Sequence, residues 1–447
     1  MNHGLAILSS ALKNKGHEVN LIDLRRLTGW EHYRQVVKDK AGEVAGITMM
    51  SVDYNAGVKA AEIIKELKPT TKVFVGGPHP SICPEELEQL ACIDCVVKGE
   101  GEVTFPQLLN DLVNGRKAPK VVQGQRLEDL DESPWADRDL FDCPEEPFVP
   151  FLKSPFVTLI AGRGCKYNCN YCQPAERIMF GRKVRRRSVA NVIDEMKYLM
   201  DRYHFNSFMV HDDCFTEDHE WVMDFCRRYK AEGFTRPFVA QSRADIICRN
   251  RNIVEMLCEA GLKLLIIGFE SGSNRVLKFL RKGCTNQQNL EAARICKELG
   301  IKIWANYMLG LPTETKEEVL ETLSMLEEIK PYHCSPAFYT PHPGSDLFEM
   351  GKKMGIHLIT NHDSYRRNTY EPKIKGPDYE FLKNALYKSI ALAEDLNQPL
   401  PSSEDSDIKT SDVPILARVR NKFKTTLVAR LPRLYRALRD IKGRCRP

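Results

Sequence analysis

Residues 164–172 read Gly-Cys-Lys-Tyr-Asn-Cys-Asn-Tyr-Cys and set three cysteines, Cys165, Cys169 and Cys172, in one short loop. The loop follows an apolar run over residues 156–161, which predicts a β-strand. Three thiolates at this spacing can turn toward one side of the loop, which suits a [4Fe–4S] cluster. Because full cysteine ligation of that cluster requires four thiolates and no fourth cysteine lies nearby, one iron would be open to another ligand.

The three cysteines could also form a different kind of site, but the sequence supports those alternatives less well. A zinc knuckle would cluster cysteines too, but it normally uses a fourth Cys or His at short spacing, and none follows. A disulfide loop does not suit a chain whose first residues show no export signal. Chance clustering is an open alternative in a chain with 15 cysteines.

The aromatic residue before the last cysteine, Tyr171, completes a pattern that resembles the signature of the radical S-adenosylmethionine (SAM) superfamily, Cys-x3-Cys-x-aromatic-Cys. The resemblance implies that the open iron chelates the amino and carboxylate groups of SAM. It also implies that an electron from the cluster splits the sulfonium and leaves a 5′-deoxyadenosyl radical, which abstracts hydrogen from a substrate. We therefore expect an enzyme that uses a [4Fe–4S] cluster, SAM and an electron donor such as flavodoxin or ferredoxin.

The composition favours two or three domains in a reducing compartment. The 447 residues are 43% apolar, which is enough for sizeable cores. No apolar run of about 18 residues occurs, so we expect no membrane-spanning helix. The first ten residues lack a secretion signal, and an odd number of scattered cysteines does not suggest a disulfide framework. We therefore expect a cytoplasmic protein.

Residues 1–125 alternate strand-like and helix-like segments, which favours an α/β fold with an open parallel sheet of the flavodoxin-like (Rossmann-like) type. We expect strands at Val19–Leu24, Val44–Met50, Lys72–Val75 and Cys95–Val97. Ligands of such sheets bind beyond the carboxyl ends of the strands. Two glycine-rich loops fall there, Gly76-Gly77-Pro78-His79-Pro80 and Gly99-Glu100-Gly101-Glu102. Such loops can equally be ordinary tight turns.

Together with the cysteine loop, the glycine-rich loops resemble the cobalamin-binding domain of the B12-dependent radical SAM subfamily. The resemblance implies cobalamin contacts from Gly76, Gly77, Pro78, His79, Gly99, Glu100 and Gly101. The motif Asp-x-His-x-x-Gly, which supplies a histidine to cobalt, is absent because Asp53–Gly57 contains no histidine. The family's domain also has a strand before the helix that we place at Leu5. We therefore expect a sheet that lacks its first strand and has unpaired edges. The sequence leaves open whether such a shortened domain binds cobalamin.

A Pro- and acid-rich linker over residues 126–155 precedes six strand–helix alternations over residues 156–345. We expect the strands at Phe156–Ala161, Ser207–His211, Pro237–Gln241, Leu262–Phe269, Ile301–Leu309 and His333–Tyr339. Six units predict a partial (β/α)6 TIM-type barrel, since eight would be needed to close it. Barrel sites gather at the carboxyl ends of the strands, where the cysteine loop also lies.

The residues expected to bind SAM follow other strands of this barrel: Asp213, Arg243, Glu270, Ser271 and Gly310. The resemblance implies that Asp213 faces the methionyl ammonium. It also implies that Glu270 and Ser271 bind the ribose or the methionyl end, and that the backbone near Gly310 meets adenine. Arg243 can clamp the SAM carboxylate or pair with Asp245. Alternatively, these residues are helix caps, turn residues or solvated loop groups.

Beyond the barrel we expect a helical cap over residues 346–397, then a flexible linker and a basic tail over residues 398–447. From Pro414 onward the tail holds eight arginines and three lysines against one aspartate. That is +10 in a chain of net charge +5, so the remainder is about −5. A basic amphipathic tail can lie on an anionic membrane, dock on the protein itself or bind a partner. Aromatic residues are sparse there, so we expect no nucleic acid.

Three functions follow from these patterns. The first is cobalamin-dependent methylation of an unactivated carbon, in which one SAM supplies the radical and another remethylates cobalamin. The alternative is an oxidoreductase or cyclase without methyl transfer, of the type of the anaerobic tetrapyrrole cyclases. A corrinoid or cluster sensor would cleave no SAM. A membrane-seeking tail would favour a small apolar substrate such as a lipid, polyprenoid or tetrapyrrole, but no pattern identifies the substrate or a catalytic side chain.

Overall fold

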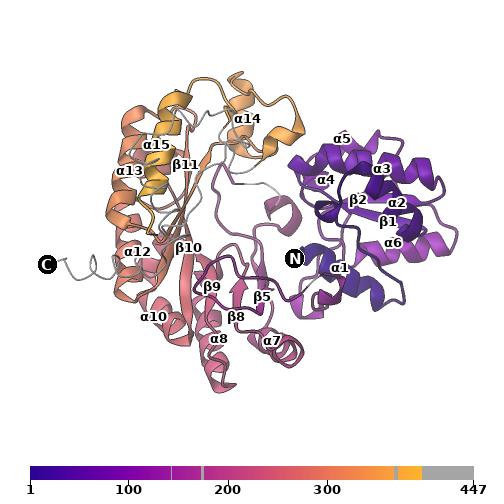
Figure 1. Cartoon of the computed structure of the whole chain (residues 1–447), viewed down its shortest axis with the longest axis horizontal. Coiled ribbons are helices and arrows are strands. Elements are labelled where there is room, and N and C mark those ends of the chain that lie inside the picture. Colours follow the sequence, from indigo (N-terminus) through magenta and orange to yellow (C-terminus); the bar gives the residue numbers. More distant parts are fainter. Residues whose placement is uncertain (142, 173–175, 367–370, 395–447) are drawn as a thin grey trace, which may run out of the picture.

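The computed structural model describes residues 1–141, 143–172, 176–366 and 371–394. They form two lobes, a smaller N-terminal one and a larger one that holds a curved sheet (Figure 1). The N-terminus lies between the lobes. None of the helices in these ranges combines the length and the apolarity that a bilayer span requires. The predicted tail, residues 398–447, lies outside the described residues.

The sheet of the N-terminal lobe is parallel throughout, and its strands stand in sequence order. They are β1 (Val44–Thr48), β2 (Lys72–Gly76), β3 (Cys95–Lys98) and β4 (Val121–Gln123). The helices of this lobe are α1 (His3–Lys13), α2 (Trp30–Lys40), α3 (Tyr54–Leu67), α4 (Pro78–Ile82), α5 (Glu85–Glu88) and α6 (Thr104–Val113). Side chains alternate across β2, so Val73 and Val75 pack against α2 and α3, whereas Phe74 packs against Phe105 of α6.

One predicted strand of this lobe is wrong, because residues 19–23 carry no regular structure and Leu24 begins a 3-10 turn. Val19 and Ile22 instead pack into the two separate clusters on either face of the sheet. The apolar pattern there reflects buried side chains without backbone pairing. Among the described residues no strand precedes β1, so β1 is one edge of the sheet. The other edge, β4, escaped prediction because its three residues are too few to show a period.

The second lobe is the predicted partial barrel. Its six parallel strands also stand in sequence order: β5 (Phe156–Leu159), β8 (Ser207–Val210), β9 (Phe238–Ser242), β10 (Leu262–Glu270), β11 (Lys302–Leu309) and β12 (His333–Phe338). A short hairpin, β6 (Gly162–Arg163) with β7 (Arg185–Arg186), follows β5. The edge strands β5 and β12 do not pair with each other, so the barrel is open.

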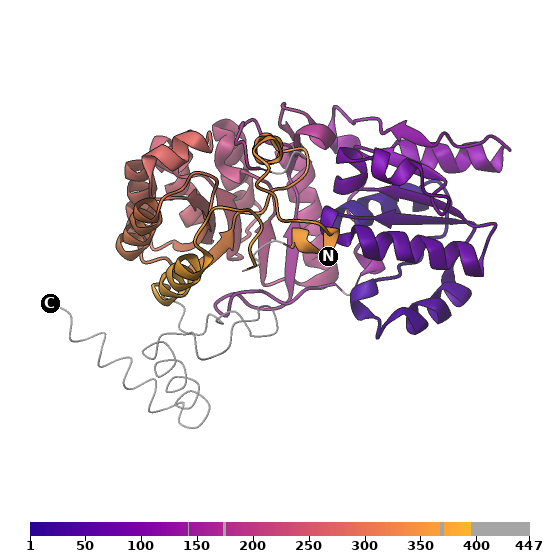
Figure 2. The ribbon, with the colours of Figure 1, turned by 90° about the horizontal axis from the view of Figure 1, so that it is seen from above.

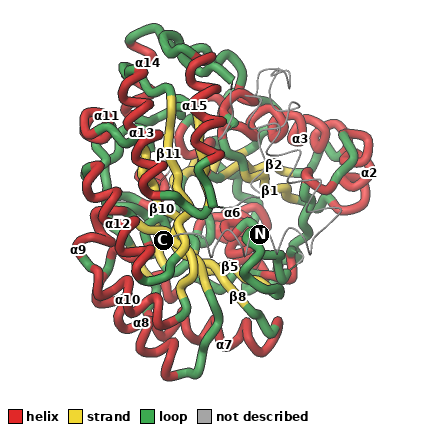
Figure 3. Tube along the Cα trace, turned by 60° about the vertical axis from the view of Figure 1, so that its left-hand side comes forward, coloured by secondary structure: helices red, strands yellow, loops and turns green. Residues whose placement is uncertain are grey.

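Helices cover the outer face of the curved sheet (Figure 3). They are α7 (Val189–Tyr203), α8 (His219–Ala231), α9 (Ala244–Arg249), α10 (Arg251–Ala260), α12 (Asn286–Glu298), α13 (Lys316–Ile329) and α15 (Tyr379–Ala391). The short helices α11 (Asn274–Phe279) and α14 (Asp346–Lys353) pack in a separate cluster through Val276 and Leu347. Phe208 and Leu265 of the strands pack with Phe225 and Leu326 of the helices in one large core. The segment after α14 lies where the two lobes meet (Figure 2).

Side-chain caps fix where two of the long helices begin. At α13, Thr315 Oγ1 accepts a hydrogen bond from the Glu318 amide, and the Glu318 carboxylate accepts one from the Thr315 amide at 2.9 Å. Thr285 and Gln288 form the same reciprocal arrangement at α12. Each such cap contributes about 0.5–2 kcal/mol, and the helices they start hold the outer side of β10 and β11.

Candidate active site

The cysteine loop leaves β5 through the hairpin strand β6. Gly164 adopts a φ of +95°, and a Cβ there would stand 3.3 Å from the carbonyl oxygen of Lys183, so the turn into the loop favours glycine. The Asn170 amide donates to the carbonyl of Leu280 at 3.1 Å, which ties the loop to the segment after α11. Of the three cysteines, Cys169 is buried and Cys172 is exposed. Three thiols outside any disulfide, on one tethered loop, match the donor set that a three-cysteine cluster needs.

A buried guanidinium lies against the loop. The Arg243 guanidinium stacks 3.6 Å from the centre of the Tyr167 ring, and Nη1 lies 3.8 Å from the Cys169 sulfur. Its Nε donates to Asp245 at 2.9 Å, and it also bonds the carbonyl of Lys282. Arg243 therefore forms the pair with Asp245 that was the alternative to a contact with SAM, and at the same time it brings positive charge to the thiols.

Glu270 and Lys282 form a second buried pair beside the loop. The Lys282 ammonium lies 2.9 Å from the Glu270 carboxylate and 3.3 Å from the Tyr171 hydroxyl. Burial by itself lowers the pKa of Lys282, but the charges of Glu270, Cys169 and Cys284 together outweigh it, so the net pKa is raised. A Cβ on Gly268 would collide with Glu270 Oε1, so a side chain at this strand end would displace the Glu270–Lys282 pair. Glu270 itself adopts a φ of +65°, an uncommon conformation for a residue with a side chain.

Ser271 and Gly310 lie at the ends of β10 and β11. Ser271 is fully buried, and its hydroxyl accepts from the Ser273 amide at 3.1 Å and lies 3.2 Å from Thr322 Oγ1. The Gly310 amide donates to Glu314 Oε2 at 2.7 Å. Burial raises the pKa of Glu314 to about 7, and its Oε1 is buried without a hydrogen-bond partner among the described residues.

The two aspartates after β8 play different roles. Asp212 is buried and accepts hydrogen bonds from the Ala161 and Gly162 amides at 2.7 and 3.0 Å, which joins the ends of β5 and β8. It also pairs with Arg186 at 3.1 Å. Asp213 is exposed and faces the cavity between the lobes. The structure thus leaves Asp213, the predicted ligand, accessible and uses its neighbour as a structural group.

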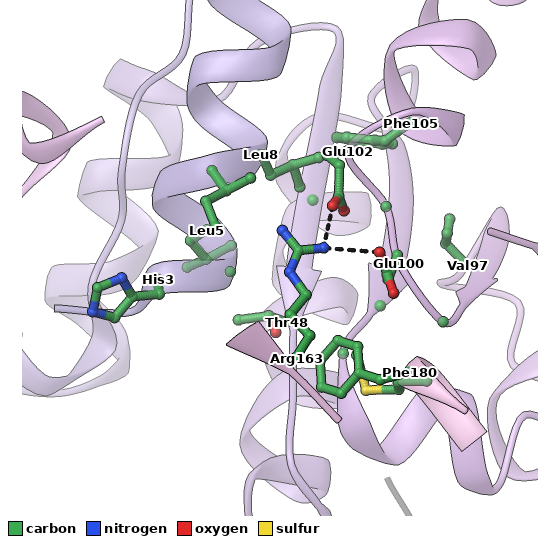
Figure 4. A pocket seen from close by; sticks show the side chains of 18 of the residues that line it. His3, Leu5, Leu8, Thr48, Val97, Glu100, Glu102, Phe105, Arg163 and Phe180 are labelled. Carbon is green, nitrogen blue, oxygen red and sulfur yellow. Dashed lines mark hydrogen bonds and ion pairs between the residues drawn. The ribbon is translucent and has the colours of Figure 1, made fainter. Parts of the chain in front are cut away.

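A cavity of about 290 Å³ lies between the two lobes (Figure 4). It extends from the carboxyl ends of β1, β2 and β3 to Gly164 and Asp213 at the ends of barrel strands. Of the residues predicted to contact cobalamin, Gly76, Gly77, Gly99, Glu100 and Gly101 line it. Pro78 and His79 do not, and His79 lies in a separate cluster with Tyr54 and Glu86.

The lining of this cavity fits a flat macrocycle. Leu5 and Leu8 of α1 form an apolar wall, and Phe105 packs in the same cluster as Leu8 (Figure 4). The floor is backbone of the glycine-rich loops. Gly77 adopts a φ of +97°, and a Cβ there would stand 2.6 Å from Thr48 Oγ1, so a side chain would distort the floor. Apolar walls over a glycine floor leave room for a broad apolar ring with polar groups at its rim.

Charged side chains at the rim link the lobes. Arg163 pairs with Glu100 at 2.8 Å and also with Glu102 (Figure 4). Arg185 pairs with Glu100 as well. Sequence patterns did not single out these arginines, nor Lys282, because nothing local marks a residue whose partner is distant in the chain. His3 also lines the cavity and lies near His211, with ring centroids 5.9 Å apart. A search for unexplained polar residues on α1 could have found it.

Comparisons with known proteins agree with this architecture. A B12 binding domain model matches residues 1–109, and a radical SAM superfamily model matches residues 159–326. An uncharacterized methyltransferase of Pyrococcus horikoshii is 29% identical over 83% of this chain and 82% of its own length. The anaerobic magnesium-protoporphyrin IX monomethyl ester cyclase of Rubrivivax gelatinosus is 26% identical, over 79% of this chain and 66% of its own. The hopanoid C-3 methylase of Methylococcus capsulatus is 25% identical, over 77% and 67%.

Among solved structures, the radical SAM methyltransferase TsrM from Kitasatospora setae, with cobalamin and a [4Fe–4S] cluster bound, has the same fold. The TM-score is 0.67 at 17% identity, over 90% of each chain. The barrel and its cysteine loop define a radical SAM enzyme. Within that class the chain belongs to the B12-binding radical SAM proteins, because both domain models match it in this order. Its cofactors are a [4Fe–4S] cluster, SAM and cobalamin.

Proposed function

We propose that this enzyme methylates an unactivated carbon of an apolar small molecule. The observation that carries the proposal is the apolar cavity that runs from the glycine-rich loops to the end of the strand that bears the cysteine loop. When bound, the cluster supplies the electron that cleaves SAM, and cobalamin supplies a transferable methyl group. The protein positions these groups and excludes water between them.

We assign the cluster to Cys165, Cys169 and Cys172. Arg243 would bind the SAM carboxylate beside the cluster, since its guanidinium is buried and its Nη1 is 3.8 Å from the Cys169 sulfur. SAM would then lie over the barrel mouth. Asp213 faces the cavity and can accept the methionyl ammonium, while Glu270, Ser271 and Gly310 would meet the remainder of SAM from the next strand ends.

We place cobalamin against the five loop residues that line the cavity, Gly76, Gly77, Gly99, Glu100 and Gly101. These residues offer backbone and little side-chain bulk, so a ring can approach closely. His3 and His211 stand at the margin of the same cavity. They are the imidazoles that could meet a corrinoid, although the motif that supplies such a histidine elsewhere is absent.

The relatives indicate the substrate class, since cobalamin would occupy the apolar cavity itself. Two of them are named for hopanoids and for magnesium-protoporphyrin. We infer a polyprenoid, lipid or tetrapyrrole substrate, an electron donor of the flavodoxin or ferredoxin type, and a cytoplasmic enzyme with a membrane-seeking tail. Residues 346–397 would form the cap that shapes the substrate pocket over the core at 156–345.

The test is a labelling experiment in cells. Host cells fed trideuteromethyl methionine express the chain or its Cys169→Ala variant, and their apolar extracts are compared by mass spectrometry. The proposal expects a product that carries the intact labelled methyl group only with the unchanged chain. An unlabelled new product would instead favour the cyclase or oxidoreductase alternative. A relative that is named as a cyclase supports this alternative. Absence of 5′-deoxyadenosine from the anaerobically reduced, cluster-loaded protein with SAM would favour a sensor.

A further inference from the structure

Two histidines and a glutamate meet where the segment after α14 contacts the N-terminal lobe. His79 belongs to α4, Glu86 to α5, and His362 to a 3-10 turn (His362–Tyr365). One side-chain ligand atom from each residue lies within 4.8 Å of the others. The Glu86 carboxylate is 2.8 Å from His362 Nε2 and 3.6 Å from His79 Nε2. Figure 1 shows the two parts of the chain approaching each other at α4, α5 and α14.

His79 has a buried nitrogen without a partner. Its side chain is 0% exposed, and Nδ1 lies 3.2 Å from Ser51 Oγ. Nε2 has no hydrogen-bond partner among the described residues, and the Glu86 oxygen at 3.6 Å is too distant for one. A hydrogen bond from Nδ1 to Ser51 would leave a lone pair on Nε2 that points toward Glu86 and His362. This is the arrangement in which proteins prepare an imidazole for a metal ion.

Aromatic rings fix the geometry of the cluster. The Tyr54 ring stacks on His362 at 4.0 Å between centroids and meets His79 edge-on at 5.2 Å. Tyr365 meets His362 edge-on, with ring centroids 5.9 Å apart. The rings are therefore held as ligands would be before an ion arrives.

We propose that His79, Glu86 and His362 bind a zinc ion that fastens the segment after α14 to the N-terminal lobe. Two imidazole nitrogens and one carboxylate form a ligand set that zinc accepts, with water in the fourth position. Zinc bonds of about 2.0–2.1 Å would set the ligand atoms about 3.3 Å apart, close to the 2.8 and 3.6 Å found here. Glu86 is 36% and His362 26% exposed, so an ion can enter from solvent.

The experiment measures zinc directly in the full chain. Because the cluster cysteines would bind zinc themselves, the starting protein carries Cys165→Ser, Cys169→Ser and Cys172→Ser. Zinc affinity is measured by competition with a chromophoric chelator, and cobalt(II) is added separately as a spectroscopic probe. We expect one zinc per chain and visible ligand-field bands with cobalt. Glu86→Gln and His362→Gln should each weaken zinc binding by at least about tenfold.

Two controls separate a metal site from a mere contact between lobes. Glu86→Gln retains an oxygen that can accept from His362 but removes the anionic ligand, so a simple hydrogen-bonded latch would survive it. His357→Gln changes a histidine of the same segment outside the cluster and should bind zinc as tightly as the starting protein. Zinc should also slow amide hydrogen exchange over residues 358–366 in the starting protein and not in Glu86→Gln. The proposal would be overturned if the starting protein bound no zinc, or if Glu86→Gln and His362→Gln bound it as tightly as the starting protein. The test does not need a His79 variant, which could fail to fold because His79 is buried.

Discussion

Arg163 and Glu100 join the two lobes through a buried ion pair. Arg163 comes from the barrel hairpin and Glu100 from the loop after β3, and their charged atoms are 2.8 Å apart. Arg185 from the same hairpin bonds the other oxygen of Glu100. A carboxylate of the B12-binding lobe thus lies between two guanidinium groups of the radical SAM lobe. This pairing sets the rim of the cavity, so the position of the two cofactors depends on it.

Removing one partner should therefore destabilise the whole protein. We expect Arg163→Met to lower the free energy of unfolding by about 3–5 kcal/mol, because Glu100 is left buried and incompletely paired. Thermal unfolding monitored by calorimetry measures the change. Arg34→Met is the control, since Arg34 pairs with Glu66 at the exposed surface, where screening by water leaves little effect. Equal shifts in the two variants would contradict the buried role of Arg163.

Gly77→Ala should impair cobalamin binding specifically. An alanine would adopt an unfavourable φ, at a cost of about 1–2 kcal/mol, and its Cβ would meet Thr48 Oγ1 at 2.6 Å in the cavity floor. Gly115→Ala is the matched control, because Gly115 also has a positive φ, +75°, but no atom within 4 Å of the added Cβ. We expect titration with hydroxocobalamin to show at least about tenfold weaker binding for Gly77→Ala. Equal affinity in both variants would argue against the proposed cobalamin site.

Arg243→Lys should weaken SAM binding while it leaves the positive charge in place. Lysine cannot reproduce the fork that holds Asp245, nor the stacking on Tyr167. We expect the apparent affinity for SAM to fall by about tenfold with the cluster absorbance retained. Arg249→Lys is the control. Arg249 also pairs with Asp245, but its side chain is 65% exposed, so this variant should bind SAM normally. Loss of affinity in Arg249→Lys alone would contradict the role given to Arg243.

Glu314 should make stability fall as the pH rises. Its carboxyl ionises near 4.5 in the unfolded chain and at about 7 in the folded one, because burial disfavours the charge and raises the pKa. The folded state binds the extra proton between these values, so stability present below pH 4.5 declines as the pH rises to 7, by about 2–3 kcal/mol. Glu314→Gln should remove that part of the decline in urea unfolding at pH 5 and pH 8. Glu317→Gln, at an exposed neighbouring position, is the control and should leave the decline of stability with pH unchanged. If Glu314→Gln showed the same decline as the unchanged chain, the decline would not come from Glu314.

The sequence predicted the elements with strong local patterns. The six barrel strands are continuous apolar runs with helical segments between them, and all six are present. The cysteine loop and the glycine-rich loops were visible because their residue types and spacing are informative by themselves. Val19–Leu24 was wrongly assigned because an apolar run does not reveal whether a neighbouring strand exists to pair with it.

Contacts between distant residues could not be read from the sequence. Lys282 beside Glu270, and Arg163 beside Glu100, depend on how loops of different strands converge. His79 was predicted as a cobalamin contact from its loop, yet its ring lies with His362, which is 283 positions later in the chain. The residues around His79 contain no pattern that predicts a contact with a side chain so distant in the chain. The predicted behaviour of the tail concerns residues that the structure does not describe.

The role of the cysteine loop can be measured most directly by cluster formation. The protein is reconstituted anaerobically with iron and sulfide, and its charge-transfer absorbance is recorded for the unchanged chain, Cys169→Ala and Cys258→Ala. Cys258 lies on α10, outside the loop, and serves as the control. We predict that the absorbance is present in the unchanged chain and in Cys258→Ala and is lost in Cys169→Ala. Undiminished absorbance in Cys169→Ala, or none in the unchanged chain, would contradict the assignment of this loop to an iron–sulfur cluster.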